Sequence, residues 1–474
     1  MTYVKKTLEY DKADPLSIEK YSQKLIGKTF GDVLRADAAV EEPQSTYADS
    51  VSSRNYKGGM GNLIEAHFFH YDINSDSRPD FPEAGVELKV TPYRINPNGK
   101  KVAKERLIIT MIDYNAIIKE DFKTSHLWSK GKRMLLIYYL FESGANKLDY
   151  RIDYSRLFTP PEEDLKIIEH DFEIIAKKVK EGKAHELSES DTMYLGAATK
   201  SSTSVVRRKQ PNSDVPAKPR AFSFKSTYMT YVLNHYIIPG KPEYEKIYDN
   251  TVSVPFEEQV NRKISKHIGE TVGELCSEYD ISYKKAPKNL EAMLAFRMLG
   301  TKGNGTEEFE KAGIIVKSIR IGKNGKIKEN MSFPVIRFTE IVKETWEEST
   351  FREYLEGTRF FFVVYGTNNK DELYLKGSMF WNVPQEDLEG DIKDVWKETR
   401  KIIEEGLQVD TSSGKQCTNF PKQADHPVCH VRPHARDAKD TYPLPTGGEF
   451  TKQCFWLNNS YILKQITLGM GNSK

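Results

Sequence analysis

The chain has 474 residues, with 70 Lys and Arg against 68 Asp and Glu, so its formal net charge is +2 at pH 7. This balance excludes a histone-like polycation but not a nucleic-acid-binding protein, because binding depends on where the basic groups lie. A hydrophobic content of 38% is enough to build packed cores, and the length predicts roughly two to four domains. No run approaches about 18 apolar residues, the N-terminus lacks a signal-like apolar stretch and cysteines are few, so we expect a soluble cytoplasmic protein without a membrane span.

Four short blocks occur twice in the same order, which indicates an internal duplication. The blocks are IGKTFGD (26–32) and IGETVGE (268–274), DFPEAGVELK (80–89) and EFEKAGIIVK (308–317), TSHLWSKGKR (124–133) and TFREYLEGTR (350–359), and FSFKSTY (222–228) and FWLNNSY (455–461). Chance could supply one pair but not four pairs in register. We therefore predict two homologous lobes, 1–238 and 255–474, joined by a Pro- and Gly-containing linker at 239–254.

Hydrophobic periodicity predicts the elements of each lobe in chain order. Residues 61–69 are expected to form a helix, 86–95 and 106–113 strands, 132–141 a strand buried on both faces, and 160–182 an amphipathic helix. The Ser-, Pro- and Arg-rich stretch 201–220 is expected to be a loop, and 358–366 repeats the doubly buried strand. The fold class is therefore α/β, with two tandem lobes that each have a mixed central sheet flanked by helices.

Two carboxylates and a lysine stand together at the start of the first predicted strand pair. Glu87 and Lys89 are two residues apart on one strand, so they share a face, and Asp80 lies just before that strand. Carboxylate oxygens are hard ligands that suit Mg²⁺, and a lysine beside them can hold a phosphate or a nucleophilic water. This combination favours metal-assisted phosphodiester hydrolysis. The same pattern also fits a solvated strand edge.

A third carboxylate, Glu65, lies on the predicted helix 61–69 in mostly apolar company. A carboxylate in such company is costly unless it is paired or bound to a metal, although a helix-surface glutamate remains an alternative. The second lobe has Phe296 where Glu65 stands, and Ile315 where Glu87 stands. The second lobe should therefore be unable to hold the metal, which leaves one active and one degenerate lobe.

The first lobe resembles the MutH-like DNA endonucleases. The string DFPEAGVELKVTP is close to the metal-binding signature of that family, RNYKGGMGNLIEAHF (54–68) resembles its preceding helix, and KTSHLWSKGKRMLLIYY (123–139) echoes later motifs. The resemblance implies Glu65, Asp80 and Glu87 as Mg²⁺ ligands, Lys89 as the catalytic lysine and Lys130 as a further active-site or phosphate-binding lysine.

The two-lobed layout resembles type II restriction endonucleases of the Sau type, which cut at 5′-GATC and carry a second, non-catalytic lobe. Double-stranded DNA would then be the substrate, with 5′-phosphate and 3′-hydroxyl products and a cognate DNA methyltransferase in the same defence system. We expect a monomer that pairs as a dimer on DNA, because one catalytic centre does not easily cut both strands at once. A strand-nicking repair endonuclease and a catalytically silent DNA-binding regulator are the alternatives.

The DNA-reading segment of the family lies near the end of each lobe, and lobe two matches it better through CHVRPHARDAK (429–439). Expected DNA-binding residues are Lys200, Arg207, Arg220, Arg432, His434, Arg436, Lys439 and Lys452. Arginine and lysine can contact guanine edges or neutralise phosphates. A basic, Pro-broken loop is also the composition of many inert surface loops. The spacing of Cys417, Cys429 and the nearby histidines is wider than zinc sites favour.

Overall fold

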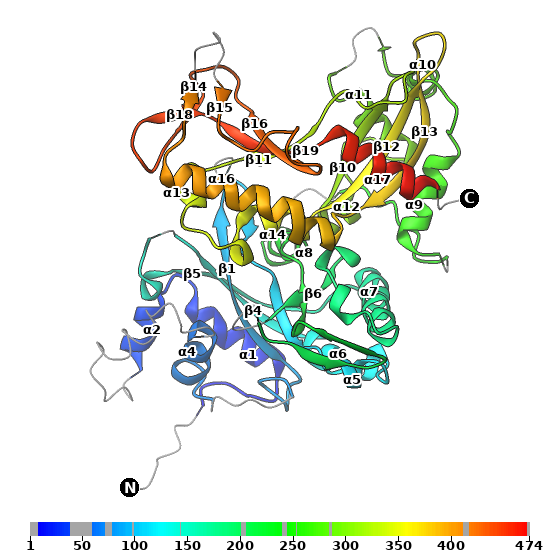
Figure 1. Ribbon diagram of the computed structural model, residues 1–474. Coiled ribbons are helices and arrows are strands. Elements are labelled where there is room, and N and C mark those ends of the chain that lie inside the picture. Colours follow the sequence, from blue (N-terminus) through cyan, green and yellow to red (C-terminus); the bar gives the residue numbers. More distant parts are fainter. Residues whose placement is uncertain are drawn as a thin grey trace. The chain divides into compact units, whose positions relative to one another are not determined.

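The computed structural model describes residues 8–37, 59–71, 78–96, 99–142, 144–200, 205–238, 244–252, 254–283, 287–410 and 417–471. The chain divides into two compact units, one of Met1–Glu243 with Glu310–Ala312 and the other of Tyr244–Phe309 with Gly313–Lys474 (Figure 1). Residues 54–58 of the family-like string and part of the predicted linker, 239–243 and 253, lie outside the described residues. Apart from Glu310–Ala312, the chain from Tyr244 onward belongs to the second unit, so this unit begins within the segment predicted as a linker.

The first unit contains a four-stranded sheet, ordered β2-β1-β4-β5, and a three-stranded sheet, ordered β3-β9-β6. Its strands are β1 (Glu87–Ile95), β2 (Lys101–Ala103), β3 (Leu107–Met111), β4 (Met134–Leu140), β5 (Ile152–Phe158), β6 (Leu195–Thr199), β7 (Arg208–Gln210), β8 (Ser213–Ala217) and β9 (Arg220–Phe224). Its helices are α1 (Pro15–Ser22), α2 (Phe30–Ala36), α4 (Gly59–His67), α5 (Tyr114–Ile117), α6 (His126–Gly131), α7 (Glu162–Lys180) and α8 (Ser226–Val232). The predicted helices and strands of this lobe are confirmed.

The predicted loop 201–220 is partly wrong. Residues 201–204 lie outside the described part of the chain, but β7 and β8 form an antiparallel hairpin. Asn212 makes the turn with a φ of 59°, a left-handed conformation that Asn tolerates better than most residues. The side-chain amide of Gln210 donates to the carbonyl oxygen of Val215 across the hairpin. Composition alone missed this pairing because turn-forming residues dominate the segment.

The second unit repeats the same plan, with a main sheet ordered β10-β12-β13 and a smaller sheet ordered β11-β19-β16. Its strands are β10 (Ile314–Ile321), β11 (Met331–Val335), β12 (Arg359–Thr367), β13 (Leu373–Trp381), β14 (Val409–Asp410), β15 (Cys417–Thr418), β16 (Cys429–Pro433), β17 (Thr441–Pro443), β18 (Glu449–Thr451) and β19 (Gln453–Leu457). Its helices are α9 (Phe256–Ser265), α10 (Val272–Glu278), α11 (Leu290–Met298), α12 (Glu307–Ala312), α13 (Phe338–Ile341), α14 (Thr350–Gly357), α15 (Gln385–Asp387), α16 (Lys393–Glu405) and α17 (Asn459–Gly471). The long helix α16 packs against β16 (Figure 1).

The strand registers reproduce the internal duplication residue by residue. In the first unit β1 runs parallel to β4 and pairs Glu87 with Met134, while in the second β10 runs parallel to β12 and pairs Ile315 with Phe360. These four positions correspond under the offsets of the repeated blocks. In the smaller sheets Phe224 pairs with Leu107 as Leu457 pairs with Met331. The two units are therefore two copies of one mixed α/β fold.

The core of the first unit holds the elements that carry the predicted site. Leu63 and Ile64 of α4 are fully buried and pack with Leu88 of β1 and Leu135 of β4. Burying such side chains contributes about 1.5–3 kcal/mol each, so helix and strand are held against each other firmly. Between them, Gly85 adopts a φ of 62°, which allows the tight turn before β1. Among the described residues, no helix is long and apolar enough to cross a membrane.

Candidate nuclease site

The five predicted site residues come from four places in the chain and lie together in the first unit. Glu65 is in the last turns of α4, Asp80 precedes β1, Glu87 and Lys89 are in β1, and Lys130 is in α6. The site therefore depends on the packing of α4 and α6 beside the first residues of β1.

Glu87 is the centre of the arrangement. Its side chain is 3% exposed, and Lys89 Nζ donates to Oε1 at 2.8 Å, while Lys130 Nζ lies 3.3 Å from both carboxylate oxygens. Oε2 is buried and has no hydrogen bond, although it lies within ion-pair distance of Lys130. A buried acceptor oxygen without a hydrogen bond is costly, and it offers a ready ligand for a cation.

The other two carboxylates are held in the protonated form more strongly than usual. Burial, followed by the charges of Asp80 and Glu87, raises the pKa of Glu65 from 4.5 to about 7. Burial and the charge of Glu87 also raise the pKa of Asp80, even though the backbone N–H of Leu88 donates to Asp80 Oδ2 at 2.8 Å. Loss of solvation is the main cause of both shifts, and the neighbouring carboxylate charges add to it.

These residues fit a divalent metal by the chemistry of their donors. All three carboxylates supply hard oxygen atoms, one of them is buried without a hydrogen bond, and their mutual repulsion would be relieved by a cation. Their oxygens do not all lie within 4.8 Å of one another, because among the described residues only a group in the second unit meets that spacing. The ammonium groups of Lys89 and Lys130 form ion pairs with Glu87 and offset its charge.

The equivalent position in the second unit is built differently. Glu308, the counterpart of Asp80, accepts hydrogen bonds from the backbone N–H groups of Ile247 and Tyr248. Lys317, the counterpart of Lys89, has no acidic neighbour at position 315, and burial lowers its pKa. The buried carboxylate of Glu308 is thus used to fix the backbone.

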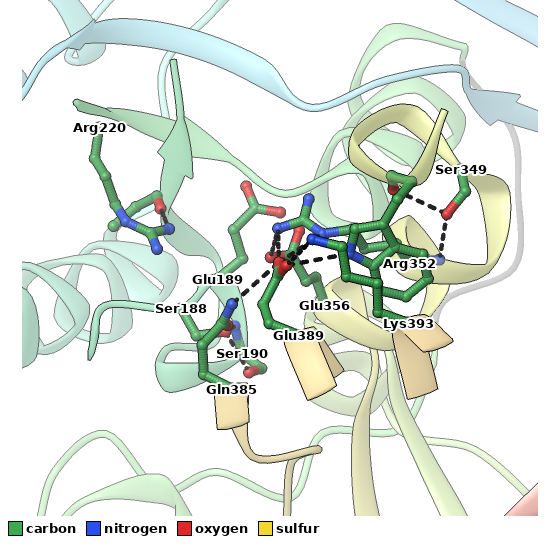
Figure 2. Close-up of polar contacts among 12 residues, drawn as sticks. Ser188, Glu189, Ser190, Arg220, Ser349, Arg352, Glu356, Gln385, Glu389 and Lys393 are labelled. Carbon is green, nitrogen blue, oxygen red and sulfur yellow. Dashed lines mark hydrogen bonds and ion pairs between the residues drawn. The ribbon is translucent and has the colours of Figure 1, made fainter. Parts of the chain in front are cut away.

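The counterpart of Lys130 is Glu356, which lies in an ion-pair network of the second unit (Figure 2). Arg352 of α14 donates to Glu356 at 2.8 Å and to Glu389 at 3.1 Å, and Lys393 also donates to Glu389 at 3.1 Å. Arg352 and Glu356 are buried. At the position that corresponds to Lys130, the second unit therefore has internally paired charges.

The predicted DNA-binding residues of the first unit differ in accessibility. Lys200 and Arg207 are exposed, but Arg220 is buried, and its guanidinium donates to the carbonyl oxygen of Ala197 at 2.6 Å (Figure 2). Arg220 thus joins β9 to β6 instead of presenting its fork to solvent. The sequence could not distinguish these roles, because all three residues lie in one basic stretch.

The predicted residues of the second unit gather at the end of the smaller sheet. Arg432 Cζ lies 4.8 Å from the ring centroid of Trp456. The ring centroid of His434 lies 5.5 Å from that of Trp456. Both Arg436 and Lys452 form ion pairs with Asp440. Arg436 Nε lies 3.6 Å from Oδ2, and Lys452 Nζ lies 2.5 Å from Oδ1.

Two features of this surface escaped prediction. Trp456 lies in the repeated block 455–461, but neither Trp456 nor Asp440 is among the residues predicted from the sequence to bind DNA. Four consecutive apolar residues in β19 gave no alternation that could single out Trp456, and its partial exposure is a property of the fold.

A duplicated mixed α/β fold, with clustered carboxylates and lysines in one copy only, defines a class of DNA-cleaving enzymes to which the comparisons also lead. A family model described as the DNA mismatch repair enzyme MutH matches residues 69–171 and 300–393, one segment in each lobe. The type II restriction enzyme Sau3AI of Staphylococcus aureus is 35% identical over 481 aligned residues, covering 91% of this chain and 97% of that protein.

The chain belongs to the MutH-like type II restriction endonucleases and is a site-specific deoxyribonuclease. Two DNA mismatch repair proteins MutH are more distant relatives. The protein of Vibrio campbellii is 23% identical over 46% of this chain and 92% of its own length, and that of Escherichia coli O139:H28 is 25% identical over 46% and 91%. A MutH protein thus spans about one lobe, which agrees with the internal duplication.

Proposed function

We propose that the chain hydrolyses double-stranded DNA at 5′-GATC in a Mg²⁺-dependent reaction, leaving 5′-phosphate and 3′-hydroxyl ends, as a defence against foreign DNA. The observation that carries the proposal is Glu87, buried between two lysines and next to Asp80 and Glu65. The similarity to Sau3AI over 91% of the chain supports this assignment. The GATC site itself rests on the family resemblance.

Each proposed site residue of the first lobe has its own role in hydrolysis. Glu65, Asp80 and Glu87 would hold the Mg²⁺, which when bound stabilises the charge that develops at phosphorus and lowers the pKa of a bound water. Lys89 would release Glu87 and hold the attacking water beside the phosphate, while Lys130 would contact a phosphate oxygen. The attacking water gives up a proton as its oxygen bonds to phosphorus, the bond from phosphorus to the 3′ oxygen breaks, and the 3′ oxygen takes up a proton.

The pH dependence of metal binding follows from the raised pKa of Glu65. A metal binds the ionised carboxylate. At pH 6, one unit below a pKa of about 7, Glu65 is ionised in only about a tenth of the molecules. The Mg²⁺ concentration for half-maximal cleavage should therefore be about tenfold higher at pH 6 than at pH 8. Cleavage rates at graded Mg²⁺ concentrations measure this; an unchanged requirement would contradict a ligand role for Glu65.

The metal-free protein should show the opposite trend in stability. The folded-state pKa of Glu65 lies above its ordinary value of 4.5, so its contribution to stability is present below pH 4.5 and lost as pH rises through about 7. The melting temperature without metal should fall over this range, and Glu65→Gln should flatten the fall. Thermal melts in a chelator at several pH values provide this control.

The second lobe is proposed to bind DNA, either as the other half of a clamp or as a regulatory site. Arg432, His434 and Arg436 are exposed, and Lys439 is exposed beside them. An arginine held over a tryptophan ring is fixed in direction, so little side-chain freedom is lost when it contacts a phosphate or a base edge. Lys200 and Arg207 are the corresponding candidates of the first lobe.

If the side chain of Arg432 reads a base, Arg432→Ala should weaken DNA binding by about 1–3 kcal/mol. If it contacts a phosphate instead, the slope of log K for binding against log salt concentration should become smaller in magnitude by about 1. Fluorescence anisotropy with a GATC duplex at several salt concentrations measures both quantities. Arg262→Ala is the matched control, because Arg262 is an exposed arginine of α9 paired with Glu258. Equal affinities of the two variants would contradict the proposed surface.

We propose that two chains pair on DNA, since one active lobe per chain cuts one strand. Substrate cleavage should then rise more steeply than linearly with enzyme concentration, and a catalytically dead chain should inhibit the intact one. Concerted cleavage of both strands by a bound monomer would exclude pairing. The system would also contain a methyltransferase that protects the host's sites, with the enzyme acting in the cytoplasm.

Incubation of the purified protein with plasmid DNA and Mg²⁺, followed by sequencing of the product ends, tests the whole proposal. Fragments with a common GATC junction and ligatable 5′-phosphates are the expected result. Single-strand nicks without linear products would favour the nickase alternative. Tight binding without any cleavage would favour a silent regulator.

A further inference from the structure

A second group of metal-type ligands lies in the second unit, with His267 and Glu270 in the turn between α9 and α10 and Glu278 at the end of α10. His267 Nδ1 is 2.9 Å from Glu270 Oε2 and 3.7 Å from Glu278 Oε2. One atom of each residue lies within 4.8 Å of the others, and among the described residues this is the only group of three His, Cys, Asp or Glu side chains that does so. None of these residues belongs to the nuclease site.

The ring of His267 is oriented with Nδ1 toward the two carboxylates and Nε2 toward Tyr279. Tyr279 hydroxyl lies 3.1 Å from His267 Nε2 and is also hydrogen-bonded to Glu278. The hydroxyl can accept from Nε2–H while it donates to Glu278, which holds the ring with Nδ1 toward the two carboxylates. A metal ligand must present an unprotonated nitrogen, and in that tautomer the Nδ1 lone pair faces both carboxylates. A cation between these three atoms would offset the charge of the two carboxylates.

The shared fold does not need this group. The first lobe builds the same turn, with Gly27 and Gly269 both at positive φ and with Thr29 and Thr271 each forming a capping box. At an offset of 242 residues, the counterparts of His267, Glu270 and Glu278 are the non-ligating Leu25, Lys28 and Ala36. The three ligands are thus a property of the second lobe alone.

We propose that His267, Glu270 and Glu278 bind one Zn²⁺ ion that ties the end of α9 to the end of α10. One imidazole with two carboxylates suits Zn²⁺ better than Mg²⁺, which prefers an all-oxygen shell. Tyr279 acts as the outer partner that fixes the ring, as carboxylates and carbonyls do at other histidine sites. Glu270 and Glu278 are 37% and 47% exposed, so the ion can enter from solvent and keep a water as its fourth ligand.

The test uses full-length protein with Asp80→Ala and Glu87→Ala, which removes the proposed Mg²⁺ site and isolates the second one. Zinc is titrated in competition with a chromogenic chelator. We expect one Zn²⁺ per chain, lost on adding His267→Ala and bound at least tenfold more weakly on adding Glu278→Gln. Zinc should also raise the melting temperature of the parent by several degrees but not that of the His267→Ala protein.

The matched control is His170→Ala, because His170 lies 3.6 Å from one carboxylate, that of Glu173, without a third ligand among the described residues. It should leave zinc binding unchanged. The proposal is overturned if the parent binds no zinc or if Glu278→Gln binds it as tightly as the parent; a protonated imidazolium would then be the cation. If His267→Ala does not fold, Glu278→Gln decides, since its side chain is about half exposed.

Discussion

Replacing Glu87 by alanine is expected to abolish DNA cleavage while DNA binding persists. The substitution removes the one buried carboxylate that both Lys89 and Lys130 contact, and with it a proposed metal ligand. Because metal catalysis supplies several kcal/mol of transition-state stabilisation, the rate should fall by about three orders of magnitude or more. Plasmid cleavage and duplex binding measured on the same preparation separate the two effects.

The chain supplies its own control for this experiment. Ile315 occupies the position of Glu87 in the second lobe, so Ile315→Ala should keep nearly full activity. Glu87→Gln preserves the shape of the side chain and should be as inactive as Glu87→Ala. A cleaving Glu87→Gln protein, or an inactive Ile315→Ala protein that still folds and binds DNA, would place the catalytic centre elsewhere.

Lys89→Ala should give the second-largest loss, about 10²- to 10³-fold in cleavage rate, with little change in the Mg²⁺ requirement. Its ammonium is proposed to position the attacking water, which contributes to the chemical step more than to binding. The loss should appear in single-turnover rates at saturating enzyme and metal. Lys89→Arg should not restore the rate, since a planar guanidinium cannot replace a compact ammonium.

Lys317→Ala is the matched control for this variant, because Lys317 has the same place on β10 that Lys89 has on β1. It lies beside Ile315 instead of a carboxylate, and burial already disfavours its charged form. Its removal should leave the cleavage rate within about twofold of the parent. Equal losses in the two variants would mean that both lobes take part in the chemistry.

Sequence pattern predicted a large part of this protein. Period-two alternation and doubly buried runs located β1, β3, β4 and β12, because strand geometry imposes these patterns directly. The repeated blocks predicted the duplication, which the equivalent pairs Glu87–Met134 and Ile315–Phe360 confirm. The hairpin β7–β8 was missed because its pairing depends on Gln210 and Asn212 rather than on apolar periodicity.

The residues predicted to bind DNA differ in the same way, because pattern along the chain does not fix their surroundings. Arg207 and Arg220 look alike in a basic stretch, yet one is exposed and the other donates to Ala197 inside a sheet. In the second lobe, the partners of Arg432 and Lys452 are Trp456 and Asp440, which come from different strands and turns. Exposure and partners are tertiary properties, so local composition could not assign them.

The near-neutral charge of +2 and the two copies of one motif were determined by the sequence alone, and so was the asymmetry between Glu87 and Ile315. Only the tertiary structure decided that Glu65, Asp80 and Glu87 share one partly buried space, where loss of solvation and mutual repulsion raise the pKa of two of them. It also brought His267, Glu270 and Glu278 together across a turn. The physical reason is that desolvation and charge–charge energies depend on distances through space, which spacing along the chain does not fix.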